Sequence, residues 1–204
     1  MIEKATVPIS THTFLHNLRT NTSQLHQSLE KLPLSQKLTA KDLSVKHYIE
    51  YLMLMKEVIS YTEKNIFPFV ANVITDINER RKLPLIESDL QYFSASVNLI
   101  SDFNYETSSE VNEAFALGIM YVIEGSSLGG TVLFKNAATI LNVTEEKGGS
   151  YFAGYKSKTG SMWKMFLDKL CEYEQKTNNE VEIINGANVA FKSIYNFMNK
   201  ADIK

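Results

Sequence analysis

The stretch EGSSLGG, Glu124–Gly130, lies inside a long apolar segment, ALGIMYVIEGSSLGGTVLF (116–134). The flanks have the spacing of a buried helix, yet three glycines fall within six residues. Each glycine in a helix interior costs about 0.5–1 kcal/mol relative to alanine. Because glycine has no Cβ, such a helix can approach a neighbour closely, and clustered Gly and Ser permit a kink. The stretch indicates either a tight helix–helix crossing or a helix lying against a flat ligand. The two serines add polar groups that a plain crossing does not need.

An apolar stripe marks a long helix near the N-terminus. Leucines and one threonine recur there at steps of three and four residues, the spacing of one helix face. They are Leu15, Leu18, Thr22, Leu25, Leu29 and Leu32. Ser10 or Thr11 can cap the start of this helix, and Pro33 is expected to stop it.

The rest of the chain has the same helical period, interrupted by prolines and glycines. A second helix opens at 40–42, and breaks are expected at Pro68 and Pro84. The polar segment 104–109 and the Gly-rich segment EEKGGSYFAGYKSKTG (145–160) are interpreted as loops, the second a long surface loop. Further helices are expected over Phe69–Arg81, Glu87–Ile100, Ser109–Leu141, Ser161–Gln175 and Val181–Met198, the last capped by Asn178 or Asn179. No strand of convincing length alternates, so we predict one all-α domain, 1–204, of about seven helices.

Composition limits the class of protein. The 204 residues carry a net charge of −2, so no overall field favours nucleic acid or an anionic membrane. The single cysteine, Cys171, excludes an internal disulfide and is expected to be a buried small residue rather than a reactive thiol. The N-terminus has no apolar signal core, and the apolar run Ala114–Ile123 is shorter than the about 20 residues of a membrane span. We therefore expect a cytoplasmic protein without nucleic-acid or membrane partners.

The first helix carries a histidine, His26, beside its apolar stripe. Arg19 precedes it by seven residues, so both share one side of the helix, roughly 10 Å apart along the axis. Glu30 follows one turn later, where a carboxylate can orient the imidazole. His26 is either a ligand facing a pocket or a boundary histidine with an ion pair on the helix surface.

The histidine pattern favours haem over a metal site built from protein ligands alone. A ferritin-like di-iron site needs Glu-x-x-His on two helices, which the chain lacks, and structural zinc needs four nitrogen or sulfur ligands. His12, His16 and His47 form no metal-binding pair with a neighbour and are interpreted as ordinary histidines. A single histidine suits haem, whose porphyrin supplies four nitrogens. Haem also needs a flat apolar slot and cations for its propionates.

Two segments together resemble the haem oxygenase family, and most closely its bacterial, phytochrome-associated type. LRTNTSQLHQSLE (18–30) is similar to the family's proximal segment, in which a basic residue, a threonine and the iron-ligand histidine stand at these spacings. YVIEGSSLGG (121–130) resembles the distal segment, where glycine pairs lie over the haem. The two segments occur in the family's order, about a hundred residues apart.

The resemblance implies roles for particular residues. His26 is implied to be the proximal iron ligand, and the distal glycines are Gly125, Gly129 and Gly130. Arg19 and Lys164 stand where the family has cations for the propionates, although the basic residue that follows one turn later in the family is Asp168 here. Phe191 falls where an aromatic residue lines the pocket, and a plain core position is its alternative.

One position departs from part of the family. Animal members have an aspartate directly after the first distal glycine, where it organises the water that delivers protons, and this chain has Ser126. The phytochrome-associated bacterial type resembles this chain in having Gly-Ser there. Our hypothesis is that the hydroxyls of Ser126 or Ser127, with backbone carbonyls of the distal helix, hold that water.

The resemblance implies an all-α haem oxygenase domain with haem between a proximal helix and a kinked distal helix. Haem is then both cofactor and substrate. It is cleaved with O2, and with electrons from a donor of the ferredoxin, flavodoxin or reductase type, to biliverdin, CO and ferrous iron. A phytochrome is a candidate recipient of the bilin. Two alternatives stay open: a haem carrier or sensor without turnover, and a haem-free protein of the same fold with a small-molecule or interaction role.

Overall fold

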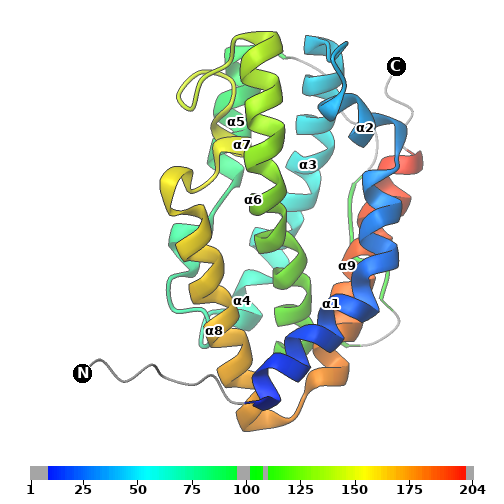
Figure 1. Ribbon diagram of the computed structural model, residues 1–204, viewed down its shortest axis with the longest axis vertical. Coiled ribbons are helices and arrows are strands. Elements are labelled where there is room, and N and C mark those ends of the chain that lie inside the picture. Colours follow the sequence, from blue (N-terminus) through cyan, green and yellow to red (C-terminus); the bar gives the residue numbers. More distant parts are fainter. Residues whose placement is uncertain (1–8, 96–101, 108–109, 201–204) are drawn as a thin grey trace.

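Helix α6 (Glu113–Leu141) is the longest element and lies in the middle of an all-helical fold (Figure 1). The computed structural model describes residues 9–95, 102–107 and 110–200. In these ranges the other elements, of which η1 and η2 are 3-10 turns, are α1 (Ile9–Glu30), α2 (Pro33–Thr39), α3 (Val45–Asn65), α4 (Phe67–Val70), η1 (Ile77–Arg80), α5 (Leu83–Tyr92), α7 (Ser150–Ala153), η2 (Lys156–Lys158), α8 (Thr159–Thr177) and α9 (Glu180–Lys200). The same ranges hold no strand, only isolated bridges between 144 and 148, so the all-α prediction is confirmed.

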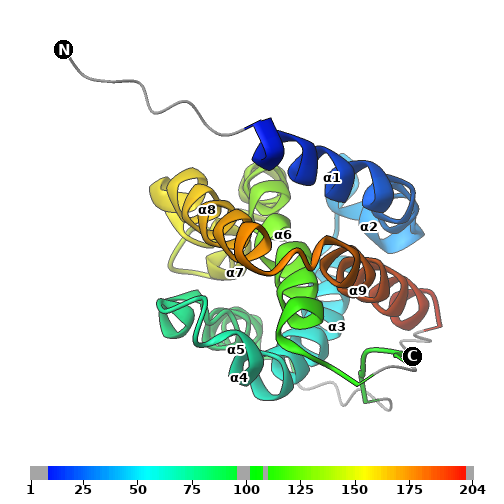
Figure 2. The same ribbon diagram turned by 90° about the horizontal axis from the view of Figure 1, so that it is seen from below.

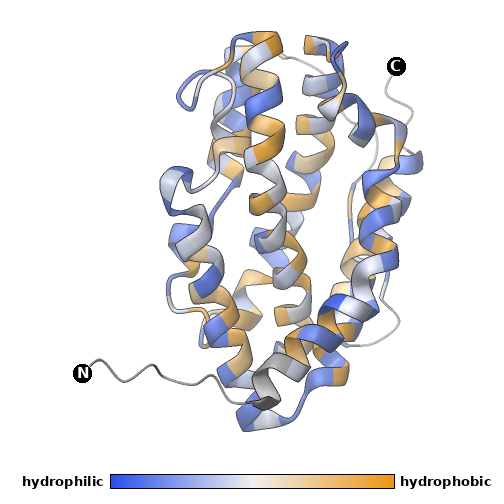
Figure 3. Ribbon diagram, in the orientation of Figure 1, coloured by the Kyte–Doolittle hydropathy of each residue, from blue (hydrophilic) through white to orange (hydrophobic). Residues whose placement is uncertain are grey.

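The first half of α6 is buried on all sides. From Ala114 to Glu124 every residue except Tyr121 is buried, as expected for a helix that is apolar all round. Seen along its axis, α6 is surrounded by α1, α3, α8 and α9 (Figure 2). Figure 3 shows hydrophobic residues along α6 and α3, whereas α1, α2 and α8 carry many hydrophilic ones. Among the described residues, only α6 is long and apolar enough to cross a bilayer, and half of its most apolar window is buried inside the protein.

The crossing of α6 with α9 depends on two glycines that the sequence pattern did not single out. A Cβ on Gly118 would overlap the carbonyl oxygen of Ile183, and a Cβ on Gly186 would overlap that of Phe115. The two backbones therefore touch directly. This contact fixes α9, and with it Phe191, relative to the buried half of α6.

Five predicted helices are confirmed as α1, α3, α6, α8 and α9, with shifted ends. The two proposed caps of α1 cannot be assigned, because the side chains of 9–12 lie outside the described residues. Ser109 also lies outside them. The residue that caps α6 is Asn112, whose side chain accepts the backbone N–H of Phe115 at 2.9 Å. Asn178 ends α8 in a left-handed conformation, and Asn179 directly precedes α9.

The helix expected over Phe69–Arg81 is wrong. Only one turn, α4, forms there, followed by tight turns and η1. Asn72, Thr75 and Asp76 are poor helix formers because their side chains compete for backbone hydrogen bonds. Arg80 is also drawn into the protein interior, where it is fully buried.

Two prolines begin helices where breaks were expected. Pro33 follows the end of α1 but opens the unpredicted α2, and Pro84 lies in the first turn of α5. A proline is tolerated there because the first N–H groups of a helix have no intrahelical partner. Helix α5 thus begins at Leu83 rather than Glu87 and ends at Tyr92, while 96–100 lie outside the described residues.

The surface loop expected over 145–160 is also partly wrong. It contains the short helix α7, in which Tyr151, Phe152 and Ala153 are buried. The buried carboxylate of Asp89 accepts the backbone N–H groups of Ser150 at 2.9 Å and Tyr151 at 2.8 Å. Asp89 therefore caps α7 from α5, a long-range contact that local glycine content does not reveal.

Candidate functional site

A cavity of about 750 Å³ lies between α1 and the middle of α6. This volume is within the usual range for small-molecule and cofactor sites. Its lining includes α2, α3, α7, α8 and α9 in addition to the two main helices. Of the residues predicted for the site, the cavity brings together Arg19, His26, Gly125, Ser126, Gly129, Gly130 and Phe191.

His26 lies on the α1 wall of this cavity. Its side chain is 54% exposed, and its Nε2 lies 3.7 Å from a carboxylate oxygen of Glu30. The ring of Phe191 meets the imidazole edge-on, with 5.5 Å between centroids and 77° between planes. An accessible imidazole, with a carboxylate one turn away and an aromatic ring beside it, is available to an incoming ligand.

Arg19 is the accessible cation on the same wall. Burial raises the pKa of the Tyr121 phenol, and the charge and hydrogen bonding of Arg19 partly oppose that rise. The guanidinium therefore lies beside Tyr121, at the end of the buried part of α6. Lys82 also lines the cavity, but its ammonium is paired with Glu124.

Lys164 lies elsewhere. It does not line the cavity and forms an exposed ion pair with Asp168, with 2.6 Å between Nζ and Oδ2. Its neighbour Trp163 lines the cavity instead. Successive helix residues are about 100° apart, so Trp163 and Lys164 point in different directions.

The three glycines of the α6 wall have different surroundings. A Cβ on Gly129 would meet no atom within 4 Å, so it would project into open space. A Cβ on Gly125 would make an ordinary contact with the Trp163 ring at 3.5 Å. A Cβ on Gly130 would lie 3.1 Å from the carbonyl oxygen of Phe152. Gly129 thus keeps the cavity open, whereas Gly130 allows α7 to pack closely on α6.

The two serines also differ. Ser126 Oγ donates to the carbonyl oxygen of Ile123 at 2.7 Å and interacts with the phenol of Tyr151. Ser127 is 8% exposed, and its Oγ has no hydrogen-bond partner among the described residues. A buried hydroxyl without a partner carries a desolvation cost.

Sequence reasoning missed four aromatic residues of the lining that lie outside α6: Tyr51, Tyr151, Phe152 and Trp163. They come from α3, α7 and α8. Tyr51 and Phe152 are stacked, with 5.6 Å between centroids. No short-range signal connects these positions, because only the folded chain brings the three elements to one wall.

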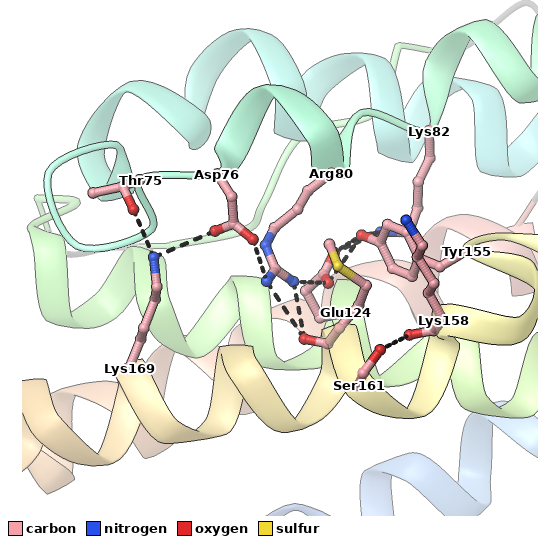
Figure 4. A network of polar contacts seen from close by, with 10 residues as sticks. Thr75, Asp76, Arg80, Lys82, Glu124, Tyr155, Lys158, Ser161 and Lys169 are labelled. Atoms are coloured by element: carbon pink, nitrogen blue, oxygen red, sulfur yellow. Dashed lines mark hydrogen bonds and ion pairs between the residues drawn. The ribbon is translucent and has the colours of Figure 1, made fainter.

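A buried ion network holds α6 at the residue before Gly125 (Figure 4). The Glu124 carboxylate accepts from Arg80 and Lys82, each at 2.5 Å, and from the Tyr155 hydroxyl at 2.8 Å. Arg80 also donates to Asp76 at 2.8 Å. Arg80, Lys82 and Glu124 are at most 4% exposed. We call this set the Glu124 network. It fixes where the glycine-containing turns of α6 lie along the cavity.

The cavity fits haem. The described residues contain no group of three or more His, Cys, Asp or Glu that could hold a metal ion, whereas haem brings four of its own nitrogens. His26 provides one imidazole, and Gly129 leaves open the space that a Cβ would fill. The lining is mostly apolar, and Arg19 offers a cation that can pair with a carboxylate.

The fold and cavity define an all-helical ligand-binding protein with its site between the first helix and a glycine-containing central helix. Residues 12–200 match the family model described as heme oxygenase. The chain is 29% identical over 196 residues to Heme oxygenase PigA of Pseudomonas aeruginosa, covering 90% of this chain and 91% of that protein. The chain therefore belongs to the haem oxygenase family.

Solved structures have the same fold. Heme oxygenase from Neisseria meningitidis, solved with NO and CO bound, matches with a TM-score of 0.72 and 22% identity over 92% of this chain and 91% of that one. Heme oxygenase-1 from Synechocystis, solved in complex with heme, matches with a TM-score of 0.65 and 17% identity over 93% of this chain and 92% of that one. Heme oxygenase 2 from Chlamydomonas reinhardtii, solved without heme, matches with a TM-score of 0.74 and 12% identity over 94% of this chain and 98% of that one.

The protein is thus an enzyme that degrades haem with O2 to biliverdin, CO and ferrous iron. Haem is both its cofactor and its substrate.

Proposed function

We propose that His26 binds the haem iron and that Arg19 pairs with a haem propionate. The observation that carries this assignment is the cavity itself, which His26 and Arg19 line from α1 and Gly129 lines from α6. Phe191 supports the imidazole from α9. Lys164 is a weaker candidate for a propionate because Asp168 already neutralises it.

Bound haem supplies an iron that binds O2 and the porphyrin ring that is oxidised. The chain orients the ring and controls the space on either side of it. His26, on α1, would bind the iron through its imidazole. On the α6 side of the cavity, Gly125, Gly129 and Gly130 would bring helix backbone close to the ring, and Ser126 or Ser127 would hold water there. Arg19 fixes the edge of the ring that carries the propionates.

The proposal extends to partners and location. Electrons come from an external donor of the ferredoxin, flavodoxin or reductase type, and a phytochrome receives the bilin. The whole chain, 1–204, works as one domain in the cytoplasm. A lone cysteine, free and buried, suits a reducing compartment, and burial raises the pKa of the Cys171 thiol to about 11.

Hemin titration tests the site. We expect a sharp one-to-one Soret band with the unchanged protein and loss of that band in His26→Ala. His16→Ala is the matched control, because His16 is an exposed histidine of α1 that does not line the cavity. Equal binding by His26→Ala and the unchanged protein would contradict the assignment.

A single turnover tests the reaction in the same preparation. With reductant under air, the Soret band should decay and a green pigment should form. A persistent Soret band without pigment would instead identify a haem carrier or sensor, and the oxygenase assignment would fail.

A further inference from the structure

The short helix α7 adds a tyrosine to the cavity wall beside Ser126. Tyr151 lines the cavity together with Ser126 and Tyr51, and its side chain is only 8% exposed. These three hydroxyl-bearing residues come from α7, α6 and α3. They form a polar cluster on a wall that is otherwise largely apolar.

Tyr151 is held in place from three directions. Asp89 accepts its backbone N–H at 2.8 Å, and Gly130 allows the neighbouring Phe152 backbone to lie against α6. The Phe152 ring, 5.3 Å from that of Tyr151, stacks on Tyr51. These contacts fix the backbone of Tyr151 and one side of its ring, and so restrict where its hydroxyl can lie, as a residue that orders water requires.

One hydrogen bond of the cluster has a fixed direction. Ser126 donates its hydroxyl hydrogen to the Ile123 carbonyl at 2.7 Å, so its own oxygen lone pairs remain available to accept. The neighbouring Tyr151 phenol, whose pKa is raised by burial and lowered by Ser126, can likewise accept a hydrogen from a water through its oxygen. Burial raises the pKa of Tyr151 well above its ordinary value and that of Tyr51 to about 12, so both phenols are neutral at pH 7.

We propose that Tyr151, beside Ser126 on the cavity lining, positions a water molecule that donates a hydrogen bond to O2 in this cavity. A water that donates one hydrogen to the Tyr151 oxygen has its second hydrogen free to point at O2. Tyr151 is a positioning residue in this arrangement, and its own hydrogen stays on it. The inference rests on the proposed function, because it requires haem and O2 in the same cavity.

The test compares Tyr151→Phe, Ser126→Ala and the double variant with Tyr48→Phe. Tyr48 is a matched control, since its buried hydroxyl donates to the Gly148 carbonyl at 2.8 Å and it does not line the cavity. Each protein is loaded with hemin, and the affinity is measured by Soret titration. The C–O stretching band of the reduced CO complex is then recorded in H2O and D2O, and the rate of a single turnover is measured.

We expect hemin affinity to be unchanged in all variants, because none alters His26 or Arg19. In Tyr151→Phe and Ser126→Ala the C–O band should move to higher frequency and lose its sensitivity to D2O. Turnover should slow by about 10²-fold or more, the range of proton-transfer effects in enzymes. The double variant should be no slower than the slower single variant, because both act through one water. Tyr48→Phe should match the unchanged protein throughout.

The outcomes separate the two claims. If the unchanged protein neither binds hemin nor turns it over, the proposed function fails. If it does both and Tyr151→Phe keeps the same C–O band and turnover rate, the inference about Tyr151 fails alone. Should Tyr151→Phe not fold, Ser126→Ala decides in the same way. An equal loss of turnover in Tyr48→Phe would also overturn the inference, because the effect would then be a general loss of rigidity.

Discussion

At the scale of single residues, the glycines of EGSSLGG answer different physical needs. Gly129 faces open space in the cavity, Gly130 faces the Phe152 carbonyl and Gly125 faces the Trp163 ring. Both interpretations of the sequence therefore apply to one stretch. Gly129 supports the interpretation as a ligand surface, and Gly130 supports the tight packing of two helices.

This difference predicts opposite behaviour of neighbouring substitutions. Gly129→Ala should raise the free energy of unfolding of the haem-free protein by about 0.5–1 kcal/mol, because alanine favours the helix and its Cβ meets nothing. Gly130→Ala should gain less or lose stability, since its Cβ would lie 3.1 Å from a carbonyl oxygen. Urea unfolding measures both. Gly129→Leu should fold but bind hemin more weakly. Equal stabilities for the two alanine variants would contradict this account.

The site residues that could be predicted from sequence are those on three long helices, α1, α6 and α9. Helical spacing within a single element places Arg19 on the same side as His26, and the structure brings both to the cavity. Lys164 lies on a predicted helix too, but the rotation of α8 brings Trp163 to the cavity instead. Tyr151 depends on Asp89, 62 residues earlier, which no local pattern reveals.

At the scale of elements, periodic helices were predictable and the segments between them were not. Helices α8 and α9 formed within about two residues of their expected ends because their apolar spacing is regular. Pro33 and Pro84 were predicted only to end or break helices. In the structure each also lies in the first turn of a new helix. The α6–α9 crossing was missed because Gly118 and Gly186 look unremarkable in isolation, and their need arises only where two backbones meet.

That crossing should not tolerate a single methyl group. Gly118→Ala and Gly186→Ala should each lower the free energy of unfolding by at least about 1–3 kcal/mol, because the added Cβ overlaps a backbone carbonyl that cannot move alone. Gly160→Ala is the control, since a Cβ there meets nothing within 4 Å in helix α8. Thermal and urea unfolding give the comparison. Wild-type stability in either crossing variant would contradict direct backbone contact.

At the scale of the whole molecule, the Glu124 network connects elements that are far apart in sequence (Figure 4). Arg80, in η1, forms ion pairs with Asp76, just before η1, and with Glu124, in α6. Lys169 of α8 also forms an ion pair with Asp76, at 3.5 Å. The segment that was expected to be a regular helix instead supplies this bridge. Its irregular path is therefore tied to the position of α6 beside the cavity.

The network should make the protein sensitive to acid. Burial raises the pKa of Asp76, but the hydrogen bond and charge of Arg80 outweigh it, so that the pKa lies below its ordinary value. A lowered carboxyl pKa stabilises the fold at pH above the ordinary value of about 4, and this stabilisation is lost as pH falls through the lower folded value. Asp76→Asn should be less stable at pH 7 and lose less stability between pH 5 and pH 3. Parallel stability curves for the two proteins would contradict this role.

Burial should also decide how much each ion pair contributes to the free energy of unfolding. Glu124→Gln leaves Arg80 and Lys82 in the interior facing a neutral amide, and removing one partner of such a buried pair costs about 3–5 kcal/mol. Lys164→Ala removes an ion pair whose partners are 75% and 62% exposed, and pairs of that kind contribute about 1 kcal/mol or less. Urea unfolding of the haem-free proteins should therefore separate the two variants by several-fold in lost stability.

Since Glu124 immediately precedes Gly125, Glu124→Gln should also weaken hemin binding at temperatures where the variant is still folded, whereas Lys164→Ala should leave it nearly unchanged. Similar losses for both variants would mean that the buried network does not hold α6 beside the cavity.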